Sequence, residues 1–219
     1  MNYLSHFYYD QTEQRPDFVI GSVYPDLVSG YSRKLKAPAI DLTQEHNIPD
    51  SLIALQEGIN RHHFIDKKFH SSDFFEDYTT KIKKDLLALE LEGVERYYYF
   101  YAHILLELLL DRVLHKRYEG LADNFYNLVD KANFKTSIAY FEWKDLSEYI
   151  DEFKKYYNFF TTSKFVYKYQ DNLSLAKALN KVHLRVNPQE MLPEDLDKIA
   201  NAMDGMEQML YDVDFNKIF

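Results

Sequence analysis

The chain contains no cysteine, one tryptophan, six glycines and six prolines among its 219 residues. The absence of cysteine excludes a disulfide framework, a thiolate metal site and a cysteine nucleophile, so nitrogen and oxygen atoms must hold any bound metal. The scarcity of glycine and proline leaves little turn chemistry for a sheet of many strands. Long stretches without either residue favour helices instead, and we expect an all-α fold.

Long hydrophobic runs and an excess of basic residues are also missing. No basic stretch followed by an apolar run opens the chain, and Glu107 and Asp111 interrupt its longest apolar segment, around residues 104 to 114. We therefore expect a cytoplasmic protein without a membrane segment. The formal net charge is −9, and no stripe of Lys and Arg alternates with aromatic residues. Nucleic acid is therefore not an expected partner.

Apolar residues are abundant, at 46%, and aromatic residues make up 16%, which excludes a disordered chain. The length suits one compact domain with a sizeable core, so we expect a single helical bundle over residues 1–219. Residues 21–49 hold several prolines and no sustained period, which predicts a long loop-rich segment with short helical pieces near a functional site. The expected helices cover residues 2–9, about 50–70, 73–91, 94–118, 121–132, 142–162, 172–184 and 193–213, with Pro16 ending the first element and Asn172 as a cap.

The first polar pattern is His62, Asp66 and His70, spaced four residues apart, so that on one helix they lie along one side. An imidazole and a carboxylate one helical turn apart can bind one metal ion, or the carboxylate can orient the imidazole. The alternative is a solvated His–Asp pair on the surface of the helix.

The second pattern is His103, Glu107 and Asp111, again four residues apart but inside an apolar segment. Carboxylates on a helix that is buried on every side need a cation or a hydrogen-bond donor nearby. A structural network with Arg112 or with tyrosine hydroxyls would meet the same need. If the two patterns face each other, they predict a polynuclear metal site of the kind found in hydrolases.

Several motifs then resemble those of the acyl-carrier-protein phosphodiesterase family, in the same order and with matching gaps. Three lie in the N-terminal third: Met1-Asn-Tyr-Leu-Ser-His6, Gly21-Ser-Val-Tyr-Pro-Asp26-Leu-Val-Ser-Gly30 and Gly58-Ile-Asn-Arg-His62-His-Phe-Ile-Asp66. Two lie near the C-terminus: Tyr167-Lys-Tyr-Gln-Asp-Asn172 and Ala178-Leu-Asn-Lys-Val-His-Leu-Arg185. The resemblance therefore extends over most of the chain.

The resemblance implies an all-helical, unorthodox relative of the HD-type metal-dependent phosphohydrolases. The implied activity is manganese-dependent hydrolysis that releases 4'-phosphopantetheine from acyl carrier protein. The chain departs from the family pattern at five positions. Glu107 stands where the family has Asp, Arg112 stands where it has His beside Asp111, and His70 replaces an Asp. His63 and His103 are additional imidazoles, where the family often has Arg and a small residue.

His6 and Asp26 lie in the two N-terminal motifs, and we expect both to bind metal together with the two patterns above. The competing interpretation makes His6 a core contact and Asp26 the start of a turn. His63 and His70 could each be a ligand, a proton donor to the leaving group or an exposed histidine. Arg185 is expected to bind a phosphate bidentately, its alternative being an ion pair.

The function that we expect is that of a metal-dependent phosphohydrolase, a phosphodiesterase that acts on acyl carrier protein or on a related phosphodiester. One or two divalent ions would be bound, manganese first, with iron or zinc as alternatives. The alternative is a module that binds a metal or ligand but has lost catalysis through the changes at Arg112 and Glu107. His46, His115 and His183 match no motif, and we expect them at the surface. The sequence does not indicate an oligomeric state.

Overall fold

A computed structural model describes residues 1–42, 48–92, 94 and 97–219. Over these residues the chain forms helices, turns and no strand, which confirms the all-α fold class. Contacts within the chain divide it into two compact units. Unit 1 consists of Met1–Lys67 and Glu119–Phe165, and unit 2 of Lys68–Tyr118 and Val166–Phe219. The organisation as one domain stays a prediction.

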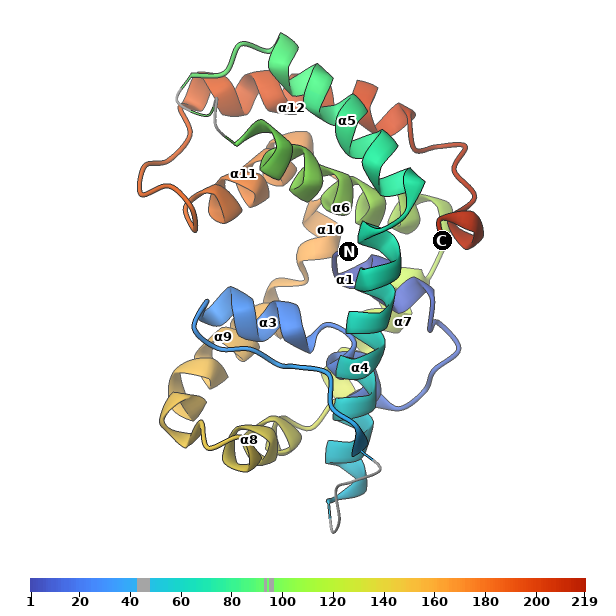
Figure 1. Ribbon diagram of the computed structural model, residues 1–219, viewed down its shortest axis with the longest axis vertical. Coiled ribbons are helices and arrows are strands. Elements are labelled where there is room, and N and C mark those ends of the chain that lie inside the picture. The colour runs from blue at the N-terminus through green and yellow to red at the C-terminus, as the bar shows by residue number, and fades with distance from the viewer. Residues whose placement is uncertain (43–47, 93, 95–96) are drawn as a thin grey trace. The chain divides into compact units, whose positions relative to one another are not determined.

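Unit 1 is built around helix α7, which packs against α1, α2 and α9, while α3 and α8 cover α9 (Figure 1). Aromatic rings fill the space near α9: Phe153 lies 4.7 Å from Phe141 and 5.7 Å from Tyr24 between ring centroids, and all three are buried. The helices are α1 (Tyr3–Tyr8), α2 (Pro16–Gly21), α3 (Tyr24–Tyr31), α4 (Asp50–His70, which ends in unit 2), α7 (Leu121–Lys131), α8 (Phe134–Trp143), η2 (Ser147–Tyr149) and α9 (Ile150–Ser163).

Two glycines allow α2 to approach α4 closely. A Cβ atom on Gly21 would lie 2.2 Å from the carbonyl oxygen of Leu55, and one on Gly58 would lie 2.2 Å from that of Phe18. Both neighbours are backbone atoms, which cannot turn aside. Only residues without a side chain fit at this crossing, and Ser22, directly after α2, is thereby held against the next turn of α4.

We expect Gly58→Ala to lower the free energy of unfolding by about 1–3 kcal/mol, because the added methyl group overpacks a backbone contact. Gly205→Ala is the matched control, since a Cβ at Gly205 in helix α12 (Pro193–Gln208) would meet nothing within 4 Å. There the loss of glycine from a helix should raise stability by up to about 1 kcal/mol. Urea denaturation of the two variants and the parent measures both effects. Equal stabilities for Gly58→Ala and the parent would contradict the close packing.

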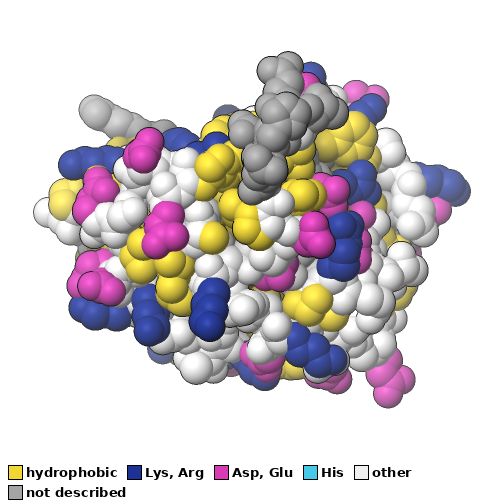
Figure 2. Space-filling view, turned by 90° about the horizontal axis from the view of Figure 1, so that it is seen from below, with side chains coloured by type: hydrophobic (Ala, Val, Ile, Leu, Met, Phe, Trp, Pro, Cys, Tyr) yellow, Lys and Arg dark blue, Asp and Glu magenta, His cyan; other side chains and the backbone are white. Residues whose placement is uncertain are grey.

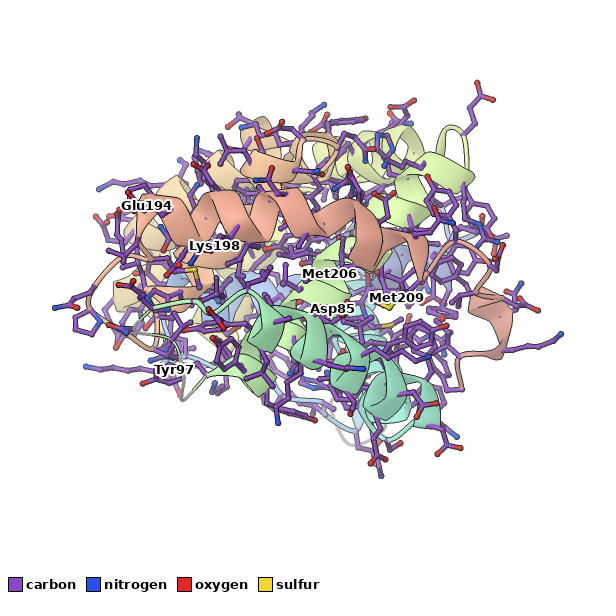
Figure 3. All side chains as sticks on the ribbon, turned by 90° about the horizontal axis from the view of Figure 1, so that it is seen from above. Asp85, Tyr97, Glu194, Lys198, Met206 and Met209 are labelled. Atoms are coloured by element: carbon purple, nitrogen blue, oxygen red, sulfur yellow. The ribbon has the colours of Figure 1, made fainter. Side chains whose placement is uncertain are left out.

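Unit 2 is a bundle in which α5, α6, α11 and α12 pack side by side (Figure 1). Figure 3 shows α12 beside α5, with Glu194 and Lys198 in the first half of α12 and Met206 in the second. Met206 is fully buried, as are Leu105 and Leu109 of α6, so α6 forms the centre of the bundle as expected. The helices are α5 (Asp73–Ala88), α6 (Tyr98–Arg117), α10 (Phe165–Lys168, which starts in unit 1), α11 (Asn172–His183), α12 (Pro193–Gln208) and η3 (Phe215–Lys217).

Several expected boundaries were wrong. Pro16 is the first residue of α2 and does not merely end an element, since its fixed φ suits a first helical position. The segment 142–162 is not one helix: Asp145 adopts a left-handed conformation (φ 54°) between α8 and η2. Asp171, not Asn172, caps α11, because its carboxylate accepts from the amide of Ser174. The expected loop-rich segment 21–49, with short helical pieces, is not among these errors: it contains α3, and its residues 43–47 lie outside the described part of the chain.

The surface carries charges of both signs. On the face shown in Figure 2, Lys and Arg side chains alternate with Asp and Glu, and small hydrophobic areas lie between them. Within the described ranges, no helix combines the length and apolar character needed to cross a bilayer.

Candidate metal centre

His6, His62 and Asp66 come together in unit 1. His6 lies on α1, and the other two lie one turn apart on α4. Asp66 Oδ1 is 3.3 Å from His6 Nε2, and Asp66 Oδ2 is 3.5 Å from His62 Nε2. The two imidazole rings stack with their centroids 4.0 Å apart. Two nitrogens and a carboxylate oxygen thus lie within 4.8 Å of one another, a spacing that a metal ion can bridge.

A backbone carbonyl sets the tautomer of His62. The ring nitrogen Nδ1 lies 2.9 Å from the carbonyl oxygen of Ser22. Because a carbonyl oxygen only accepts, Nδ1 carries the proton and donates it. In the neutral ring, the lone pair of Nε2 then faces Asp66 and His6. Backbone acceptors fix the tautomer of metal-binding histidines in proteins in the same way. The glycine crossing of α2 and α4 is what brings this carbonyl to His62.

Burial and neighbouring charges shift the pKa values of the two imidazoles in opposite directions. Burial, reinforced by the nearby His62, lowers the pKa of His6 to about 3, so its ring is neutral near pH 7. Burial also opposes a charge on His62, but Asp66 and the carboxylate of Asp26 outweigh it and raise its pKa. Burial alone would favour the neutral acid of Asp66, yet contacts with His6 and His62 hold its pKa well below the usual range. The centre therefore keeps a carboxylate and one neutral imidazole near pH 7.

The amino group of Met1 also contacts this centre, as a hydrogen-bond donor to Asp66. It donates to Asp66 Oδ1 at 2.7 Å, so a cation that binds Asp66 has to compete with it for that oxygen. Asp26, on α3, is half-buried and close enough to His62 to raise its pKa. It lies outside the tight group of three, and its role as a further ligand stays a prediction.

The donor set fits a divalent cation. His6 is fully buried, yet within the described residues neither of its ring nitrogens makes a well-directed hydrogen bond, despite the 3.3 Å approach of Asp66. A buried polar group left in this state costs roughly 1–3 kcal/mol. A cation between His6, His62 and Asp66 would accept the lone pairs of both rings and offset the carboxylate charge.

We expect the metal-free protein to lose stability between pH 6 and pH 4.5 because of His6. The unfolded chain binds a proton on this ring below pH 6.5, whereas the folded chain excludes it down to about pH 3. The contribution of the neutral His6 ring to the free energy of unfolding is therefore fully present above pH 6.5. It falls by about 1.4 kcal/mol for each pH unit below that value. Urea denaturation at both pH values measures the loss. His6→Gln should flatten the dependence, and an unchanged slope in that variant would contradict the assignment.

A second group forms in unit 2. His70, the last residue of α4, meets His103 and Glu107 of α6, and all three are partly exposed. The first sequence pattern is therefore divided: His62 and Asp66 join His6, whereas His70 joins the second pattern. The two groups have no member in common. A single polynuclear centre that combines both patterns stays a prediction.

The remaining candidates lie outside both groups. Half-buried His63 donates from Nε2 to the carbonyl oxygen of Ala37 at 2.7 Å. Arg185 is exposed just beyond the end of α11. Asp111 is completely buried on α6, and its neighbour Arg112 forms an ion pair with Glu207, 2.9 Å between Nε and Oε2. Roles for His63, Asp111 and Arg185 in catalysis or metal binding stay predictions.

The expected surface position of His183 was wrong. His183 is buried in unit 2, donates from Nε2 to the carbonyl oxygen of Gln189 at 2.7 Å, and accepts from the hydroxyl of Tyr101 at 2.5 Å. The apolar residues on the same side of α11 could have predicted that His183 is buried. His115 is half-buried, with its ring against Tyr167, and His46 lies outside the described residues. The part of Ser22 at the metal centre was also missed, because a backbone carbonyl leaves no mark on residue type.

Comparisons of the chain with models of protein families, with curated proteins and with solved structures find no match. The resemblance of its motifs to the acyl-carrier-protein phosphodiesterase family therefore stays a prediction, and the site geometry is the evidence on which a function can be argued.

Proposed function

We propose that the protein is a metal-dependent phosphohydrolase whose centre is His6, His62 and Asp66. The observation that carries the proposal is a buried pair of imidazoles that both approach the carboxylate of Asp66. The carbonyl of Ser22 sets the tautomer of His62, and the ring of His6 makes no well-directed hydrogen bond within the described chain. A cation between the three residues would make the close approach of both imidazoles to Asp66 favourable.

The chain's own residues have distinct tasks in this proposal. His6 and His62 supply nitrogen ligands, and Asp66 supplies the anionic ligand and, with an exposed fraction of 27%, the side of the centre that substrate can reach. Asp26 supplies a second carboxylate near His62. A divalent ion held there would provide the Lewis acid and the activated water that phosphodiester hydrolysis requires. No nucleophile from the protein is needed.

The finer assignments rest on the motif resemblance. They are manganese as the ion, a phosphodiester as the substrate and acyl carrier protein as the molecule that carries it. A cytoplasmic location is a separate proposal from the sequence, because Glu107 and Asp111 interrupt its longest apolar segment. Mixed imidazole and carboxylate ligation suits manganese, and it also suits iron and zinc. The net charge of −9 disfavours an acidic carrier protein unless it meets a local basic patch.

The test is the metal content of the purified protein together with its turnover of bis(p-nitrophenyl) phosphate in added manganese. We expect a bound divalent metal, manganese-dependent release of p-nitrophenol, and loss of both when the metal is removed with a chelator. A protein that binds no manganese, judged by a melting temperature that the ion does not raise, would contradict the proposal.

One observation favours a second candidate, a module that binds metal without catalysis. His6 and His62 are 0% and 2% exposed, and within the group of three only the Asp66 side chain, 27% exposed, gives a substrate direct access. The same experiment separates the two functions. Tight manganese binding without turnover of small phosphodiesters would favour the binding module.

A further inference from the structure

The contacts of His70, His103 and Glu107 cannot all be hydrogen bonds. His103 Nε2 lies 2.8 Å from Glu107 Oε1, His70 Nε2 lies 3.3 Å from the same oxygen, and the two Nε2 atoms are 3.1 Å apart. Each ring nitrogen carries at most one proton. If both protons point at the carboxylate, two donors face each other; if one nitrogen accepts from the other, the donating ring has no proton left for Glu107.

A single cation resolves this conflict, because it makes all three contacts attractive at once. The three atoms form a triangle with sides of 2.8, 3.1 and 3.3 Å. A point at the usual zinc–ligand distance of about 2.0–2.1 Å from each atom exists about 1 Å to one side of their plane. The three atoms are therefore spaced closely enough for one zinc ion to contact all of them.

The surroundings of the three residues suit such a site. The ring of Phe75 lies edge-on to both imidazoles, with centroids 4.9 Å from His70 and 4.9 Å from His103, and so restricts both rings. The side chains of His70 and His103 are 33% and 27% exposed, which leaves solvent access to the group. Two histidines and one glutamate with an open position form a ligand set that zinc uses when it also binds water or a substrate.

We propose that His70, His103 and Glu107 form a second metal site, selective for an imidazole-preferring divalent ion of the zinc class, with a coordination position open to solvent. The ligands share no residue with the centre in unit 1. The second site therefore does not depend on the proposed function, and either site can exist without the other.

The test is a titration of the chelator-treated full chain with zinc by calorimetry, followed by the visible spectrum with cobalt as a zinc substitute. We expect His103→Gln and Glu107→Gln each to lose one zinc equivalent relative to the parent, or to bind it at least about 100-fold more weakly, because a metal ligand is removed. The cobalt spectrum should lose the matching absorption. His62→Gln should keep this zinc equivalent.

The matched control is His115→Gln, which removes a half-exposed imidazole from the last turn of the same helix. It should bind as many zinc ions as the parent. His103 and Glu107 are partly exposed, so we expect both variants to fold. Their helical circular dichroism verifies this. Zinc binding that is equal in the parent, His103→Gln and Glu107→Gln would overturn the proposal, as would a parent that binds no zinc.

Discussion

The Asp66→Asn variant is expected to bind manganese at least about 100-fold more weakly than the parent and to lose manganese-dependent hydrolysis to a similar degree. Asp66 is the anionic member of the group and contacts both imidazoles, 3.3 Å from His6 and 3.5 Å from His62. An amide keeps the shape of the side chain but offers a cation a neutral, weaker oxygen ligand. Calorimetry with manganese and initial rates with bis(p-nitrophenyl) phosphate measure the two losses.

Glu57→Gln is the matched control for Asp66→Asn. Glu57 also lies on α4, its substitution removes the same charge, and its carboxylate pairs with Arg15 at 2.6 Å, away from the two histidines. Manganese affinity and rate should stay within about twofold of the parent, since exposed ion pairs contribute little to stability. If Asp66→Asn hydrolysed the substrate as well as Glu57→Gln, Asp66 would not be a ligand.

The Arg112→Met variant is expected to unfold with a free energy about 3 kcal/mol lower than that of the parent. Arg112 and Glu207 are both buried in unit 2, with Nε and Oε2 2.9 Å apart. Removal of one member of a buried pair leaves the other charge uncompensated, at a cost of roughly 3–5 kcal/mol. Lys116, 2.6 Å from Glu207, keeps the loss at the lower end. Urea denaturation measures it.

The double variant Arg112→Met, Glu207→Leu should recover most of that loss, because two apolar side chains replace a buried pair without leaving a charge. Arg117→Met is the control, as it removes an exposed arginine five residues farther along α6 and should cost under about 1 kcal/mol. A double variant less stable than Arg112→Met would contradict a paired burial. The pairing with Glu207 gives Arg112 a structural task in the helix bundle of unit 2.

The helices and the local spacing of the ligands could be predicted from the sequence. The period of four places His62 above Asp66 on any helix, and the helix from Asp50 to His70 follows from its apolar period and the proline before it. The association of His6 with this pair came from the motif resemblance, since no local rule connects residues more than fifty positions apart. The structure brings them together through the packing within unit 1.

The division of each pattern could not be predicted. Spacing places His62, Asp66 and His70 on one side of a helix, but which partner each turn meets depends on the packing of other helices. His70 therefore joined Glu107, whereas Asp66 joined His6. The close contact of Gly21 with Gly58 was equally hidden, because residue type alone does not distinguish a glycine at a helix crossing from the unobstructed Gly205.

Anomalous scattering from crystals soaked in manganese tests the central claim most directly. The account predicts a manganese peak in unit 1, bonded to His6, His62 and Asp66, with the amino group of Met1 displaced from the carboxylate. A soaked crystal in which these three side chains keep their direct contacts, and in which no anomalous peak lies between them, would contradict it.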